Sequence, residues 1–181
     1  MIFVKRLIIG LSLTVLGTGI FFNIASAQDV PMTAIQIEQI KSSCVSAKNT
    51  MAQLHANDAL LRVNRGQMYE SMTTKLMSRF NDRVDSNHQN SKGLTTVTQS
   101  YNAALTTFRI DYQSYEESLS AALKIDCTNE PVTFYDAVAD ARSKRTQVHV
   151  DVVKLHQYID DYQAAFDTFA TSFLHLSGGN N

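Results

Sequence analysis

The sequence contains few of the residues that interrupt regular secondary structure. It has no tryptophan, two prolines and seven glycines in 181 residues. Three of the glycines fall in the first 27 residues, so only four remain for the rest of the chain. A β-sandwich needs a turn about every 8–12 residues, which this composition does not supply. Long helices with few connections need little such punctuation, so the composition favours an all-α fold.

The chain also lacks the sequence signatures of catalysis. It has no glycine-rich phosphate loop, no G-x-S-x-G or S-x-x-K motif and no C-x-x-C-H haem motif. His149 and His156 are seven residues apart, too far along a helix to share one metal ion. The formal net charge of −1 argues against a nucleic-acid surface, which needs a basic patch. We therefore expect no enzyme, no cofactor, no metal site and no nucleic-acid partner.

The first 27 residues have the pattern of a secretory signal peptide. Lys5 and Arg6 precede an apolar run from Leu7 to about Ile24, and Ala25-Ser26-Ala27 then supplies small residues for a signal peptidase. The alternative is an uncleaved anchor, because the apolar run is nearly long enough to span a bilayer. No second run of that length follows. We therefore predict a secreted or extracytoplasmic protein that contacts the membrane only through this segment, if the segment is retained.

Residues 28–181 are long enough for one domain with a hydrophobic core. Apolar residues recur at spacings of three and four over about 32–86, 94–124 and 130–176, which predicts three helices. The third has the clearest pattern, a seam typical of coiled coils. Residues 85–93 have no large apolar side chain and are the best candidate for a chain reversal. The predicted fold is an elongated antiparallel three-helix bundle.

The two cysteines test this arrangement. If the first reversal centres near residue 89, antiparallel pairing places Cys127 opposite about residue 51, and Cys44 lies about 10 Å further along the axis. A non-helical stretch around residues 125–128 can cover that gap. Both cysteines follow the signal peptide, and disulfides are expected in oxidising compartments. We predict a Cys44–Cys127 disulfide; the alternatives are two free thiols or an intermolecular bridge.

Charged residues interrupt the apolar seams, and one such position is Asp111. If the second reversal lies near residue 128, Arg145 of the third helix pairs with Asp111. The first helix then places Arg65 at about the same height, with Tyr69 or Tyr112 nearby. A carboxylate between two guanidinium groups can hydrogen-bond to both. We therefore predict a buried polar layer formed by Asp111, Arg145 and Arg65.

A second polar layer is predicted nearer the disulfide, from Asp58, Arg62 and Arg142. Buried charged layers often fix helix register and partner choice at a cost in stability. Two other interpretations remain open for both layers. They line a pocket for an anionic ligand, or their charged groups simply reach solvent.

These observations lead to a functional hypothesis. We expect an exported, non-catalytic helical module of the bacterial cell envelope or the extracellular space. Its role would be that of an adaptor or spacer, acting through a protein partner or self-association. The alternative is an extracytoplasmic helical bundle that binds a small ligand or a metal between its helices.

Overall fold

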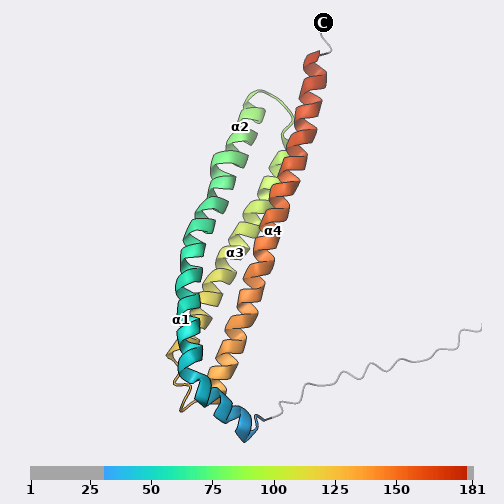
Figure 1. Ribbon diagram of the computed structural model, residues 1–181. Coiled ribbons are helices and arrows are strands. Elements are labelled where there is room, and N and C mark those ends of the chain that lie inside the picture. Colours follow the sequence, from blue (N-terminus) through green and yellow to red (C-terminus); the bar gives the residue numbers. More distant parts are fainter. Residues whose placement is uncertain (1–30, 179–181) are drawn as a thin grey trace, which may run out of the picture. The chain divides into compact units, whose positions relative to one another are not determined.

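Three long helical segments form the part of the chain that the structure describes. The computed structural model describes residues 31–178, shown as helices joined by two short connections in Figure 1. These residues include no strand. The all-helical prediction with three segments is therefore confirmed. The predicted signal peptide, residues 1–27, lies outside the described residues.

The first segment is continuous but changes its helical type. It consists of α1 (Ala34–Ser71), the π-helical stretch η1 (Met72–Met77) and α2 (Ser78–Ser86). The sequence predicted a helix over about 32–86, without the π-helical stretch. A capping box starts α1, in which the Gln36 amide donates to the Thr33 hydroxyl and the Gln36 side chain accepts from the Thr33 amide.

The second and third segments are α3 (Lys92–Lys124) and α4 (Pro131–Gly178), where 94–124 and 130–176 were predicted. The turn before α3 uses His88, whose φ of 55° lies in the left-handed region. The Gln89 amide then donates to the Val84 carbonyl at 3.0 Å, which satisfies one of the last carbonyls of α2. None of the helices within residues 31–178 combines the length and hydropathy needed to cross a membrane.

The disulfide joins α1 to the connection between α3 and α4. Cys44 and Cys127 are bonded, with 5.6 Å between their Cα atoms, so the predicted pairing is confirmed. Phe134 of α4 packs on the bridge and is buried with both cysteines. The Lys48 ammonium group donates to the Ile125 carbonyl at 2.9 Å. The disulfide and this hydrogen bond fix α1 at residues 44 and 48 against the second connection.

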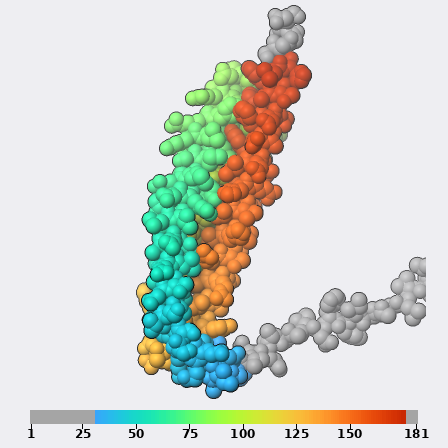
Figure 2. Space-filling model, in the orientation of Figure 1, coloured from blue at the N-terminus to red at the C-terminus, as the bar shows by residue number. Residues whose placement is uncertain are grey.

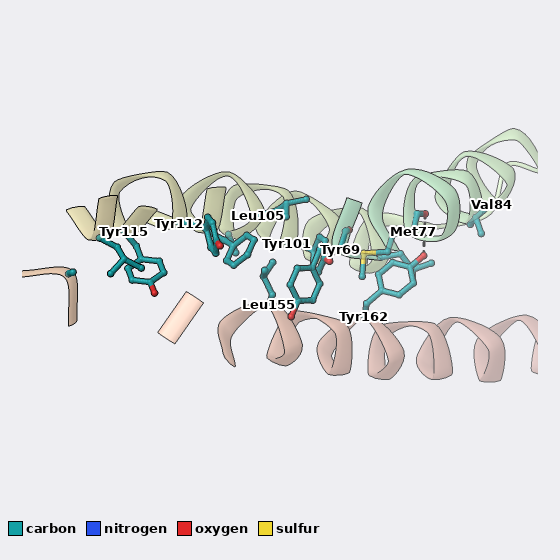
Figure 3. Packing of buried hydrophobic residues seen from close by; sticks show 14 residues of the cluster. Tyr69, Met77, Val84, Tyr101, Leu105, Tyr112, Tyr115, Leu155 and Tyr162 are labelled. Carbon is teal, nitrogen blue, oxygen red and sulfur yellow. Dashed lines mark hydrogen bonds between the residues drawn. The ribbon is translucent and has the colours of Figure 1, made fainter. Parts of the chain in front are cut away.

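The main core lies between the three segments, and α3 and α4 share the most extensive interface. Tyrosines contribute much of it, and Figure 3 shows Tyr69, Tyr101 and Tyr162 between the helices. A buried tyrosine needs a partner for its hydroxyl group. The Tyr101 hydroxyl donates to the Tyr69 carbonyl at 3.0 Å. The Tyr162 hydroxyl has its nearer acceptor in Asn81 Oδ1, at 2.9 Å, and the Met77 carbonyl lies 3.3 Å away. Burial raises the pKa of Tyr101 to about 12, so this phenol stays a donor.

The two carbonyls that receive these bonds flank the π-helical stretch. Tyr69 lies three residues before Met72, where the stretch begins, and Met77 is its last residue. A π-helical insertion widens the helix and changes which carbonyls are paired within it. The Tyr101 hydroxyl of α3 binds the backbone just before this irregular region, and the Tyr162 hydroxyl of α4 lies between the Met77 carbonyl and the Asn81 side chain at its other end.

Candidate functional site

The middle of α1 has an unusually polar inner face. Of the residues in α1, only Cys44, Asp58 and Tyr69 are buried. Between Asp58 and Tyr69 the positions turned toward the other helices include Arg62, Arg65 and Gly66. These residues do not fill the interior as large apolar side chains do. A helix packed on such a face leaves space against its neighbours.

That space is a cavity of about 230 Å³ between α1, α3 and α4, which we call the arginine cavity. Three arginines and one aspartate belong to its polar lining, which is Asp58, Arg62, Arg65, Tyr112, Tyr115, Arg145 and His149. Its apolar lining is Leu61, Phe108, Val148 and Val152. A larger groove of about 880 Å³ lies between the first segment and α3, and it shares Arg62, Phe108 and Tyr112 with the cavity. Figure 3 shows Tyr112 and Tyr115 next to each other on α3.

Asp58 is the central acceptor of the arginine cavity. Its residue is 9% exposed, and its carboxylate accepts from the Tyr115 hydroxyl at 2.7 Å and from Arg145 Nε at 3.1 Å. The hydrogen bond to Asp58 raises the pKa of Arg145. Burial, followed by the hydrogen bond to Asp58, raises the pKa of Tyr115. Both donors therefore keep their protons, and one carboxylate links all three helices.

Arg62 and Tyr112 also line the arginine cavity. The Arg62 guanidinium pairs with the Glu116 carboxylate at 2.6 Å and lies 5.3 Å from the centre of the Tyr112 ring. Tyr112 is 6% exposed, and the Glu116 carboxylate lies beside its hydroxyl as an acceptor. Burial raises the pKa of Tyr112, and the nearby Glu116 charge raises it further. Tyr112 therefore keeps its proton.

The structure regroups the two predicted polar layers. Arg145 pairs with Asp58, which was assigned to the other layer, and Asp111 instead lies beside Asp151 of α4. Arg65 is exposed and lines the cavity, with no ion pair among the described side chains, whereas Arg142 is exposed outside the lining. The predicted groupings are therefore wrong, although Asp58, Arg62, Arg65 and Arg145 all line one cavity.

The reach of long side chains accounts for the different partners. The register of α1 against α3 is as predicted on both sides of the π-helical stretch, since Asn81 meets Thr98 and Arg62 meets Glu116. Long side chains, however, reach neighbours one turn above or below their own level. Arg145 therefore reaches Asp58, and Asp111 meets a residue six positions beyond Arg145. The sequence analysis expected Tyr112 near a polar layer, but it missed the contributions of Tyr115 and Glu116, although Tyr115 follows the helical spacing of buried residues.

Gly66 contributes open space to the groove between the first segment and α3. A Cβ atom at this position would meet nothing within 4 Å, and Gly66 lines the groove. We expect Gly66→Ala to raise the free energy of unfolding by about 1 kcal/mol, because alanine favours the helix interior over glycine. Urea denaturation measures the change. An unchanged or lower free energy of unfolding would contradict this expectation, because it would mean that the backbone of α1 requires glycine at position 66.

Asp111 and Asp151 place two carboxyl groups together between α3 and α4. Asp151 is buried, and one of its oxygens accepts from the Gln147 amide at 3.2 Å. Burial, and then the hydrogen bond with Asp111, raises the pKa of Asp151, while Lys154 on the same helix lowers it. The fold therefore favours the protonated form of Asp151. This stabilisation is present below the pKa of an unfolded aspartate, about 3.9, and is lost as the pH rises through the folded pKa.

We therefore expect Asp151→Asn to melt at a higher temperature than the wild type at pH 7. The difference should shrink as the pH falls through the folded pKa toward about 4 and be absent below it, because the wild-type carboxyl is then neutral as well. Thermal denaturation followed by circular dichroism from pH 3 to pH 8 measures this. Asp161→Asn, at an exposed position on the same helix, is the control and should show no such trend. A wild type that gains stability steadily toward neutral pH relative to Asp151→Asn would contradict the expectation.

The histidines and acidic residues of the described part of the chain do not form a metal site. Within residues 31–178, no three His, Cys, Asp or Glu side chains are grouped closely enough to hold a metal ion. His156, one of the two histidines considered from the sequence, has its Nε2 atom 3.1 Å from the Tyr69 hydroxyl.

Comparisons with protein-family models, with curated proteins and with solved structures find no match to this chain.

Proposed function

We propose that the chain is an exported, non-catalytic module of the bacterial cell envelope or the extracellular space. Its fold would be an elongated antiparallel three-helix bundle that acts as an adaptor or spacer. The Cys44–Cys127 disulfide supports the compartment, because disulfides persist where conditions are oxidising. Nucleic acid is not among the expected partners, and membrane contact would be limited to an uncleaved N-terminal segment.

A stripe of exposed apolar side chains on the first segment carries the interaction role. Leu61, Met68 and Leu76 are 47%, 48% and 51% exposed. The spacing of seven between the first two puts them on one face of α1. The spacing of eight to the third is offset by the wider turns of η1, so the stripe continues. Figure 2 shows the surface of this segment alongside α4 on one side of the helical unit. Contiguous exposed apolar surface is typical of protein interfaces.

Self-association through this stripe is the form of the proposal that we test. Sedimentation velocity of the oxidised full chain should show a dimer or larger species at micromolar concentration. Met68→Ser with Leu76→Ser should shift it toward the monomer, because both changes remove apolar area from the interface and neither residue lines the arginine cavity. Ile110→Ser, at an exposed apolar position on α3, is the matched control and should leave the association unchanged. A monomeric wild type, or equal effects of both variants, would contradict self-association through α1.

Ligand binding is a second candidate function, and the arginine cavity is the observation that favours it. The cavity combines charged and apolar lining between three helices, as ligand pockets in helical bundles do. Native mass spectrometry of the chain would reveal a retained small molecule. Such a ligand on a monomeric chain would favour this candidate over the adaptor role.

A further inference from the structure

Resting on the proposed self-association, we infer that a second copy of this chain docks parallel to the first. The first segment of each copy lies against α4 of the other, and a two-fold axis parallel to the helices relates them. Such an interface uses the same surface on both copies, so that surface must be complementary to itself. Charge and apolar exposure on the first segment and α4 meet this requirement.

The first segment carries a row of exposed cations beside the end of its apolar stripe. Lys75, Arg79 and Arg83 follow one another at spacings of four, which puts them on one side of the helix. Lys75 is the direct neighbour of Leu76 in the stripe. None of the three cations belongs to an ion pair among residues 31–178. They are therefore available to an acidic surface.

α4 carries the complementary row. Val153, Asp160 and Asp167 recur at spacings of seven, so they share one face of the helix, and all three are exposed. Neither aspartate takes part in an ion pair in the described part of the chain. Val150, one turn before Val153, is exposed as well. This row is apolar at one end and acidic at the other, as the first segment is apolar and then basic.

The α4 row lies on the side of α4 that is next to the first segment. His149 lines the arginine cavity together with Leu61, and Val153 follows His149 by four residues. His156 Nε2 lies 3.1 Å from the Tyr69 hydroxyl, and the first aspartate of the row follows His156 by four residues. Figure 1 shows the first segment and α4 running alongside each other in the same direction. One side of the helical unit therefore presents both rows.

The charged parts of the two rows stand at the same height. The Phe80 and Phe166 rings lie 5.1 Å apart across the two helices. Arg79 directly precedes Phe80, and Asp167 directly follows Phe166. The next charge of each row, toward the disulfide, lies one to two turns away. A two-fold axis parallel to the helices keeps these heights, so cations of one copy face carboxylates of the other.

The apolar parts match in the same way. Tyr69 and His156 are in contact, Met68 directly precedes Tyr69, and Val153 lies less than one turn before His156. In the parallel pair, the stripe of one copy therefore packs on the exposed valines of the other. The antiparallel alternative places the first segment against the first segment and α4 against α4, so that no opposite charges meet. Complementary charges favour the parallel arrangement, as they set partner orientation in coiled coils.

Charge reversal tests the arrangement by sedimentation velocity of the oxidised full chain at pH 7 and low salt. Lys75→Glu with Arg79→Glu should raise the dissociation constant of the dimer at least about tenfold, because carboxylates then face carboxylates. Asp160→Lys with Asp167→Lys should weaken association to a similar extent. An equimolar mixture of these two variants should associate again, because both contacts of the mixed dimer are complementary. The four changes combined in one chain should restore the dimer for the same reason.

Lys92→Glu with Lys124→Glu is the matched control, because it changes the net charge equally at exposed positions of α3. It should leave association unchanged, and circular dichroism should show that every variant is folded. A dimer sensitive to the first-segment changes but not to the α4 changes would reject the parallel pairing and leave self-association intact. Failure of both the mixture and the combined variant to associate would also reject it. A monomeric wild type would overturn this inference and self-association together, and would leave both rows to a different partner.

Discussion

Replacing both Cys44 and Cys127 with serine should lower the free energy of unfolding by about 4.5 kcal/mol. The bridge links residues separated by 83 positions. In the chain-entropy model, removing a cross-link over a loop of that length restores about this much conformational freedom to the unfolded state. The effect should appear as a lower urea midpoint for the double variant than for the oxidised wild type. The same protein in reducing agent is the matched control, because it loses the bond without changing the side chains.

The loss of the bridge should also have a local effect on α1. Before Asp58, Cys44 is the only buried residue of this helix. Without the disulfide, residues 34–57 retain few apolar contacts and mainly the Lys48–Ile125 hydrogen bond. Hydrogen exchange in this range should therefore become faster than in α3 and α4. If the reduced protein keeps its urea midpoint and its exchange pattern, the disulfide does not stabilise the fold as the structure implies.

Asp58→Ala should have the second largest effect, a loss of about 2 to 3 kcal/mol in the free energy of unfolding. The change leaves the buried Tyr115 hydroxyl without its acceptor and removes the partner of Arg145. An unsatisfied buried hydroxyl costs about 1–3 kcal/mol. The Arg145 side chain is 52% exposed, so water can solvate its charge and limits the additional cost. Urea denaturation of the oxidised protein measures the total.

Asp136→Ala, at an exposed position on α4, is the control for this prediction. It should leave stability nearly unchanged, since surface substitutions usually have small effects. Tyr115→Phe offers a further check, because it removes the donor and the need for the acceptor together. The Asp58→Ala change should therefore cost less in the Tyr115→Phe background than in the wild type. Equal costs in both backgrounds would show that the tyrosine and the aspartate do not interact.

The sequence predicted the helical segments well because their signal is local. Apolar residues at spacings of three and four specify which face of a helix is buried, whatever its neighbours are. The long stretches without glycine or proline marked the helices, and the polar segment before Gly93 marked the first reversal. The pairing of Cys44 with Cys127 followed from the helix lengths, and the non-helical connection before α4 covers the offset of about 10 Å, close to two helical turns, that the counting left.

The polar contacts were harder to predict because they depend on register to within one turn. The sequence identified Asp58, Arg62, Arg65 and Arg145 as residues that interrupt the apolar pattern, and all four line the arginine cavity. It assigned them to the wrong groups, because a long side chain such as Arg145 can reach a carboxylate one turn above or below its own level. A shift of a few residues hardly changes an apolar seam, but it changes which carboxylate meets which guanidinium.

By itself, the sequence determined that this chain forms long helices, where they break, and which two cysteines join. These properties come from the periodicity and composition of each segment, which act over short distances. Only the tertiary structure decided that Asp58 bonds to Tyr115 and Arg145, that Asp111 meets Asp151, and that a cavity opens beneath α1. Those features arise where side chains from different helices pack at one height. That height depends on every turn of helix between them.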